Sequence, residues 1–324
     1  MADIIRILSI DGGGIRGIIP AMVLNEIEKQ AGKPISELFD LIAGTSTGGI
    51  LALGLTRPNG SGKAQFSAED FIELYEKEGK RIFSRSFWHR VRAMGNLGDE
   101  RYPADGLEEL LNKYFENTPL RDALTPLIIS SYEIEQRFPF FFRSARAKEN
   151  AAYDFPMKKV ARATSAAPTY FEPLKLETSE TVGYYALVDG GVFANNPAMC
   201  AYVEGRDIYP EKKDFLLVSL GTGELTRPLL YEEAKNWGLV GWAQPLLSVV
   251  FDGVSDTVDY QLKQLLAPKR NQPRYYRFQV RLSEGNDDMD DAGPTNLRVL
   301  KLLAEEMIHQ RAKEIKMLVR QLTG

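Results

Sequence analysis

The residues best suited to chemistry lie in the stretch 39–55, FDLIAGTSTGGILALGL. An apolar run at Phe39–Ala43 is long enough for a buried strand, and a second apolar run after the turn has helical pitch. Between them, Gly44 to Gly48 form a G-x-S-x-G turn, and this strand–turn–helix context is typical of a nucleophile elbow that exposes the hydroxyl of Ser46. The glycines remove side chains that would crowd the turn. The alternative is a glycine-rich junction with an incidental serine, since short patterns recur by chance.

A second glycine-rich loop, Asp11–Gly17, follows an expected strand at Ile4–Ile10. Gly12, Gly14 and Gly17 match the G-x-G-x-x-G pattern of dinucleotide sites, which would require an acidic residue at the end of the second strand. Here the second strand ends in the serine turn instead. We therefore interpret the loop as backbone N–H groups directed at the oxyanion of an acyl-transfer intermediate. A nucleotide-binding protein with a phosphate cradle at this loop is the alternative from another functional class.

A serine nucleophile needs a neighbouring base, and the chain contains two histidines. His89 lies in a basic segment, between Trp88 and Arg90. His309 falls on the polar side of a helix expected at Thr295–Gln321. Neither position favours a histidine as the base.

Asp189 is the stronger candidate for the base. It ends an expected strand at Tyr184–Val188, and Gly190 and Gly191 follow it and leave room for a substrate. A carboxylate there could accept the proton of Ser46 directly, and partial burial would raise its basicity. The alternative is that Asp189 is an ordinary turn residue.

The elements that would position these groups alternate between strands and helices along the chain. Strands followed by helices, with glycine turns at strand ends, predict a largely parallel sheet covered on both faces. No linker is recognisable, so we expect one domain over residues 1–324. A helix from about Pro20 is expected to end at Gly32. The further elements expected are a helix opened by a capping box at Ser67 and Asp70, helices at Asp105–Phe115 and Met157–Thr164, and strands at Leu127–Ile134, Phe138–Arg143, Phe215–Leu220 and Arg274–Leu282, the last half exposed with Arg277 on its polar side.

Composition limits the classes of function. Of 324 residues, 44% are hydrophobic and 26% charged, with a net charge of −4, which argues against a general nucleic-acid-binding protein. There is one cysteine, Cys200, no apolar run of membrane-spanning length and no signal-peptide pattern, so we expect a cytoplasmic protein.

Two charged segments allow binding hypotheses. Lys77–Arg92 carries six basic residues and one acidic residue with aromatic residues between them; it is either a solvated surface or a surface for anionic headgroups that gives peripheral membrane contact. Glu284–Asp291 holds five acidic residues but lacks the spacing of a calcium loop. We expect a solvated loop there, and no metal or cofactor.

Several motifs together resemble one family. DGGGIRG at Asp11–Gly17, GTSTG at Gly44–Gly48 and VDGG at Val188–Gly191 occur in the order and contexts of the patatin-like phospholipases. SAAPTYFEP at Ser165–Pro173 and NNP at Asn195–Pro197 are similar to further segments of that family. The resemblance spans about residues 4–225, which leaves 226–324 as a C-terminal elaboration.

This resemblance implies a three-layer α/β/α sandwich and a lipid acyl hydrolase of the phospholipase A or lysophospholipase type. Ser46 would be the nucleophile, Asp189 its partner, and a small-acyl esterase or thioesterase is the alternative within enzymes. The expected partner is a phospholipid or other lipid ester and not a nucleic acid polymer, and a regulatory nucleotide is left open. The oxyanion hole is assigned to Gly12, Gly13, Gly14, Arg16 and Thr47, and the supporting motif glycines are Gly17, Gly44, Gly48, Gly190 and Gly191.

Overall fold

The computed structural model describes residues 4–83, 105–168, 170–178, 183–226, 228–282 and 289–324. Eight strands of the described residues form one sheet: β1 (Ile5–Ile10), β2 (Leu41–Thr45), β3 (Leu127–Glu133), β4 (Phe138–Arg143), β5 (Leu174–Glu177), β6 (Tyr184–Asp189), β7 (Phe215–Leu220) and β9 (Tyr275–Phe278). Their order is β5-β6-β3-β2-β1-β7-β9, with β4 also paired to β3. The pairs from β3 to β9 are parallel, whereas β4, β5 and β6 pair in antiparallel fashion.

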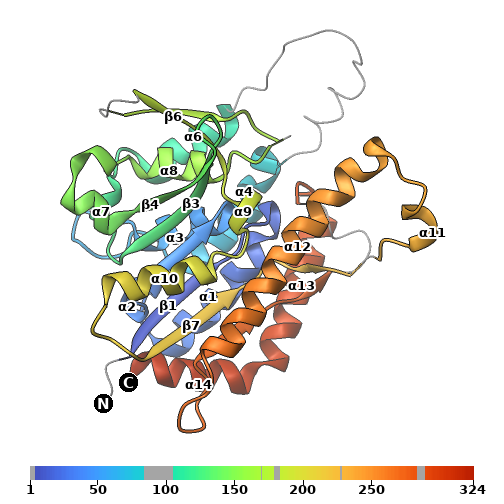
Figure 1. Ribbon diagram of the computed structural model, residues 1–324. Helices are drawn as coiled ribbons and strands as arrows, with labels where there is room; N and C mark the ends of the chain where they lie inside the picture. Colours follow the sequence, from blue (N-terminus) through green and yellow to red (C-terminus); the bar gives the residue numbers. More distant parts are fainter. Residues whose placement is uncertain (1–3, 84–104, 169, 179–182, 227, 283–288) are drawn as a thin grey trace.

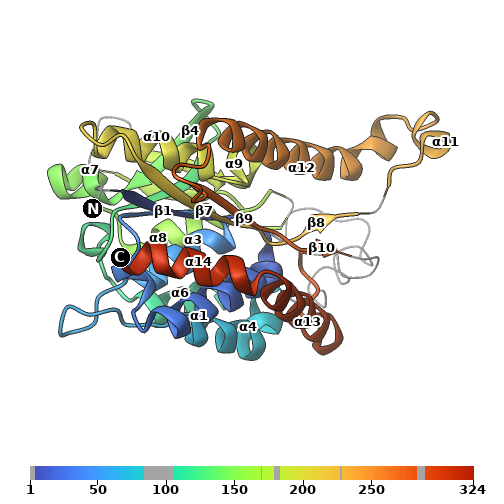
Figure 2. The same ribbon diagram turned by 90° about the horizontal axis from the view of Figure 1, so that it is seen from below.

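Helices cover both faces of this sheet, so the predicted three-layer architecture is confirmed (Figure 2). One face carries α1 (Ile18–Ala31), α3 (Thr47–Thr56), α4 (Ala68–Phe83), α6 (Asp105–Phe115), α8 (Met157–Thr164), α13 (Pro294–Gln310) and α14 (Ala312–Thr323). The other carries α10 (Ala198–Ile208) and the long α12 (Leu239–Leu265). Shorter elements are η1 (Gly14–Gly17), α2 (Ile35–Leu38), η2 (Leu120–Asp122), α7 (Ser144–Glu149), η3 (Ala151–Tyr153), α9 (Gly191–Ala194), α11 (Tyr231–Ala234) and a two-stranded ladder of β8 (Glu224–Leu225) and β10 (Arg281–Leu282).

Strand β1 shows how the sequence builds two cores. Ile5 and Ile7 point to the core shared with α10 and α12, while Leu8 and Ile10 point to the larger core on the opposite face. Successive side chains of a strand alternate between faces, so a strand covered on both sides needs apolar residues at nearly every position. The central position of β1 therefore follows from its composition.

Two local predictions at helix ends are confirmed. Gly32 ends α1 in the left-handed conformation, with a φ of 64°. At the start of α4, the N–H and the hydroxyl of Ser67 both lie 2.7 Å from the Asp70 carboxylate. These signals depend on residues within one helical turn, which makes them readable from the sequence.

Two predicted elements are corrected. The expected strand Arg274–Leu282 divides, because β9 stays in the main sheet and β10 leaves it to pair with β8. The expected helix Thr295–Gln321 breaks at Arg311, whose guanidinium lies over the ring of Phe278 at 5.1 Å. In both places the predicted element is interrupted where the chain contacts residues distant in sequence: β10 pairs with β8, and Arg311 packs on Phe278. The helix α12 was not anticipated.

Some expectations fall outside the described residues. The basic segment Lys77–Arg92 is described only as far as Phe83, the end of α4, and most of the acidic segment Glu284–Asp291 is not described. Across the described ranges, no helix has both the length and the apolar character required to cross a membrane.

Candidate active site

Ser46 is the single residue between β2 and α3, as the strand–turn–helix prediction requires. Its φ of 55° and ψ of −124° place a residue with a side chain in a strained backbone region. The N–H of Ser46 donates to Oγ1 of Thr164 at 2.8 Å, and that hydroxyl donates to the carbonyl of Ser130 at 2.7 Å. The end of α8 therefore fixes the turn, while the Ser46 side chain is half-buried.

Close backbone approach explains the glycines of the turn. A Cβ on Gly44 would lie 2.3 Å from the carbonyl oxygen of Gly48, and a Cβ on Gly48 would lie 2.2 Å from that of Ile10. A Cβ on Gly190 would lie 2.3 Å from Oγ of Ser130. Any side chain at these positions would push the strand ends apart at the place where Ser46 projects.

Two strands share one edge of β3, and this arrangement brings the predicted pair together. β2 pairs with the first part of β3 as far as Thr45 opposite Ser130, and β6 begins at the next position with Asp189 opposite Ser131. β4 occupies the other edge. Because β2 is parallel and β6 antiparallel to β3, their carboxyl ends meet, which places Asp189 beside Ser46.

Asp189 is buried and hydrogen-bonded on two sides. Its carboxylate accepts a hydrogen bond from the Ser46 side chain and another from the N–H of Gly191 at 2.7 Å. Burial raises the pKa of Asp189 to about 6, and the two hydrogen bonds oppose this rise. The group is therefore mainly ionised at neutral pH, yet more basic than an ordinary aspartate, as a general base should be.

The glycine loop runs directly past Ser46. A Cβ on Gly12 would lie 3.2 Å from the Cβ of Ser46 and 2.5 Å from Oδ1 of Asn195. The N–H of Gly12 donates to the Asn195 carbonyl at 3.0 Å, and the Gly12 carbonyl accepts from Oγ1 of Thr222 at 2.6 Å. Gly12 is thus held in place by its own backbone groups, and its N–H is already used.

The neighbouring glycines carry the available donors. Ile15 donates its N–H to the Met289 carbonyl at 3.0 Å, and Arg16 donates its N–H to the Gly13 carbonyl at 3.2 Å. The buried Arg16 side chain also donates to that carbonyl, at 3.3 Å. Within the described residues, no acceptor is found for the N–H groups of Gly13 and Gly14. These two groups are the loop donors that an oxyanion could use.

Thr47 adds the N-terminus of a helix to the same region. It is the first residue of α3, so its N–H has no acceptor within the helix. Its hydroxyl hydrogen-bonds to the hydroxyl of Tyr75, and a Cβ on Gly17 would lie 2.4 Å from Thr47 Oγ1. The positive end of the α3 dipole thus lies just after the Ser46 side chain.

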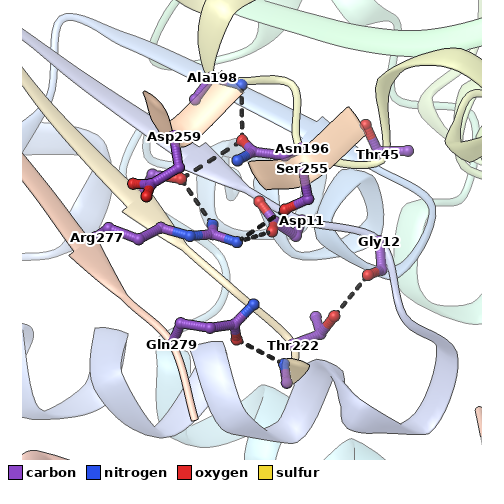
Figure 3. Close-up of polar contacts among 12 residues, drawn as sticks. Asp11, Gly12, Thr45, Asn196, Ala198, Thr222, Ser255, Asp259, Arg277 and Gln279 are labelled. Atoms are coloured by element: carbon purple, nitrogen blue, oxygen red, sulfur yellow. Dashed lines mark hydrogen bonds and ion pairs between the residues drawn. The ribbon is translucent and has the colours of Figure 1, made fainter. Parts of the chain in front are cut away.

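Beneath the loop, Asp11 forms a buried ion pair with Arg277 at 2.6 Å (Figure 3). Arg277 also donates to the hydroxyls of Ser219 at 2.8 Å and Ser255 at 3.2 Å. Burial raises the pKa of the Asp11 carboxyl, and the guanidinium of Arg277 opposes that rise. The expectation that Arg277 lies on the exposed side of its strand is therefore wrong, because α12 covers that side.

Sequence reasoning did not identify three groups that fix this site: Thr164, Thr222 and Arg277. Thr222 lies in a Gly-Thr-Gly turn at the end of β7, a position that resembles the other strand-end turns and could have been recognised. Nothing near Thr164 or Arg277 in the sequence indicates their partners.

One of the two histidines lies within the described residues. His309 is exposed on α13, as predicted, and His89 lies outside the described residues. In those same described ranges, no group of three histidine, cysteine, aspartate or glutamate side chains could hold a metal ion.

The chain is similar to known proteins over most of its length. A family model described as "Patatin-like phospholipase" matches residues 8–202, more than half of the chain. "Patatin-like protein 4" of Arabidopsis thaliana is 30% identical, covering 94% of this chain and 84% of its own length. "Probable inactive patatin-3-Kuras 1" of Solanum tuberosum is also 30% identical, with coverage of 97% and 89%. Among solved structures, VipD from Legionella pneumophila is 12% identical with a TM-score of 0.42, covering 94% of this chain and 67% of that one.

Proposed function

Because the chain belongs to the patatin-like phospholipase family, we propose that it hydrolyses fatty-acyl ester bonds of phospholipids or lysophospholipids. The observation that carries this proposal is the hydrogen bond from the Ser46 side chain to the buried carboxylate of Asp189. One relative is named as probably inactive, so membership of the family does not establish activity by itself. The contact between a strained serine and a basic carboxylate is the additional support.

In the proposed reaction, Oγ of Ser46 attacks the acyl carbonyl carbon while its proton passes to Asp189. The oxyanion accepts hydrogen bonds from the N–H groups of Gly13 and Gly14, close to the N-terminus of α3 at Thr47. Collapse of the intermediate expels the alcohol, which takes the proton from Asp189 and leaves an acyl ester on Ser46. Water then attacks this ester while Asp189 takes its proton. Collapse of the second intermediate breaks the bond between the acyl carbon and Oγ of Ser46, which takes the proton back from Asp189 as the fatty acid leaves.

The alternatives differ in how they use the same residues. A small-acyl esterase or thioesterase would share the chemistry and differ only in the acyl group accepted. A phosphate cradle at Gly12–Gly17 would require several N–H groups directed at the ligand. Three of them, from Gly12, Ile15 and Arg16, donate within the protein, which disfavours the nucleotide-binding alternative.

A fluorophosphonate probe and lipid-product analysis test the proposal. Wild type and the control Ser61→Ala, at an exposed loop position, should be labelled and should release fatty acid from phospholipid. Ser46→Ala should do neither. Absence of labelling in wild type would overturn the proposal, while a labelled enzyme that hydrolyses only short-chain esters would favour the small-acyl alternative.

A further inference from the structure

Residues 229–251, which include α11 and the first half of α12, form an apolar arm that extends away from the three layers (Figures 1 and 2). From Asn236 to Phe251 the sequence contains no aspartate, glutamate, lysine or arginine. The large apolar side chains exposed on the arm are Leu229, Leu230, Tyr231, Trp242, Leu246, Val249 and Val250.

The contacts of α12 show where the arm lies relative to the site. Val258 packs into the core against the sheet, and one turn earlier Ser255 accepts a hydrogen bond from Arg277. Still earlier, Asp252 lies close enough to Arg16 for that cation to lower its pKa, against the rise caused by burial. Followed from its carboxyl end towards its amino end, α12 therefore passes first the core and then the glycine loop. The amino-terminal half of α12, which belongs to the arm, extends about 20 Å beyond the glycine loop at 1.5 Å per residue.

This end of the molecule is the carboxyl edge of the parallel strands, where Ser46 and Asp189 lie. Single exposed apolar residues are common on protein surfaces, but a contiguous apolar stretch usually marks an interaction surface. On the arm, Trp242, Leu246 and Val249 follow helical spacing along one face. Near the start of α12, the ring centroids of Trp237 and Trp242 lie 5.3 Å apart.

We infer that the arm inserts into the boundary between headgroups and acyl chains of a lipid bilayer and thereby holds the carboxyl edge of the sheet against the substrate. The inference rests on the proposed function, since a phospholipid substrate resides in such a surface. Tryptophan side chains favour this boundary, and amphipathic or apolar helices bind it in proportion to the apolar area buried. Because residues 236–251 of the arm carry no charged side chain, binding does not require anionic lipid.

Co-sedimentation with phosphatidylcholine vesicles tests the inference directly. We compare four proteins: wild type, Ser46→Ala, an arm variant and a control. The arm variant is Trp242→Gln/Leu246→Gln/Val249→Asn. The control, Val203→Asn/Leu302→Gln, changes apolar residues of α10 and α13 that are 60% and 53% exposed. Wild type, Ser46→Ala and the control should bind equally, in low and in high salt. The arm variant should bind about tenfold more weakly or less.

Hydrolysis assays separate this inference from the proposed function. On a water-soluble short-chain ester, the arm variant should match wild type, whereas on vesicles its rate should fall about tenfold. If no protein hydrolyses any ester but the binding pattern holds, the proposed function fails and the docking surface stands. If the arm variant binds vesicles as wild type does, the docking surface is overturned.

Three further measurements test the folding, the oligomeric state and the membrane depth of the arm. Circular dichroism melting should show the arm variant folded, since the changed side chains are exposed. Light scattering should give the same molar mass for wild type and the arm variant. If wild type is a dimer, the arm variant is a monomer and vesicle binding is unchanged, the arm is a contact between two copies of the chain. Finally, brominated phosphatidylcholine should quench tryptophan fluorescence in wild type, and the conservative change Trp242→Phe should reduce quenching while preserving binding.

Discussion

Arg277 donates to the carboxylate of Asp11 at 2.6 Å, although 266 positions separate the two residues in the sequence. Asp11 opens the glycine loop beside Ser46, whereas Arg277 lies in β9, beyond the residues 8–202 that the family model matches. The C-terminal part of the chain therefore supplies the charge that supports this loop from below.

Removing that charge should destabilise the protein. Arg277→Met keeps much of the side-chain volume but leaves Asp11 buried without its partner, which should lower the free energy of unfolding by about 3–5 kcal/mol. The matched control Arg281→Met changes an exposed arginine of the next strand and should alter it by about 0.5 kcal/mol or less. Urea unfolding measures both, and equal effects would show that Asp11 does not depend on Arg277.

The donors of the loop should be sensitive to a single methyl group. A Cβ on Gly13 would lie 2.3 Å from Oγ1 of Thr222, so Gly13→Ala must displace the loop and its N–H groups. Loss of one oxyanion donor should reduce kcat about 100- to 1,000-fold. Gly60→Ala, at a position with no atom within 4 Å of the new Cβ, should leave kcat unchanged. Near-normal turnover by folded Gly13→Ala protein would remove this loop from the mechanism.

The pH dependence of activity should follow Asp189. Its carboxylate form is the proposed base, and burial raises its pKa to about 6. We therefore expect kcat/KM on a soluble ester to be constant above that value and to fall about tenfold per pH unit below it. An unchanged rate down to pH 4, near the ordinary value for aspartate, would contradict a buried carboxylate base.

The raised pKa of Asp189 also predicts that its ionised carboxylate lowers the free energy of unfolding. A folded-state pKa of about 6, above the ordinary 3.8, favours the protonated carboxyl in the folded protein. This contribution to stability is complete below pH 4 and is lost as the pH rises through 6, a change of about 3 kcal/mol. Asp189→Asn has no charge to bury, so it should be more stable than wild type by up to about 3 kcal/mol at pH 8. Urea unfolding should show this difference in the free energy of unfolding at pH 8 and no difference at pH 4.

The catalytic pair should act without histidine. Asp189→Asn should be nearly as inactive as Ser46→Ala, and the double variant little worse than either, since groups that act as a unit lose function non-additively. His309→Gln, at an exposed position of α13, should keep wild-type turnover. Loss of activity in His309→Gln with a tolerated Asp189→Asn would replace the pair with a histidine-based site.

How far the sequence predicts this protein depends on the range of each interaction. The turn at Ser46, the left-handed Gly32 and the capping box at Ser67 were readable because each depends on neighbours within one turn of chain. Asp189 could be proposed from its place at a strand end as the base for Ser46, and the resemblance to a family supported that pairing. The exposed side assigned to Arg277 was wrong because alternation along a strand does not say what covers each face.

The sequence by itself determined which segments become strands, helices and sharp turns, since hydrophobic periodicity and glycine positions act locally. Only the tertiary structure decided that β2 and β6 end head to head on one edge of β3, which places Ser46 against Asp189. Strand order and direction are set by how all layers bury their apolar faces together, and no short stretch carries that information. The burial that raises the pKa of Asp189, and the pairing of Asp11 with Arg277, exist only after that assembly.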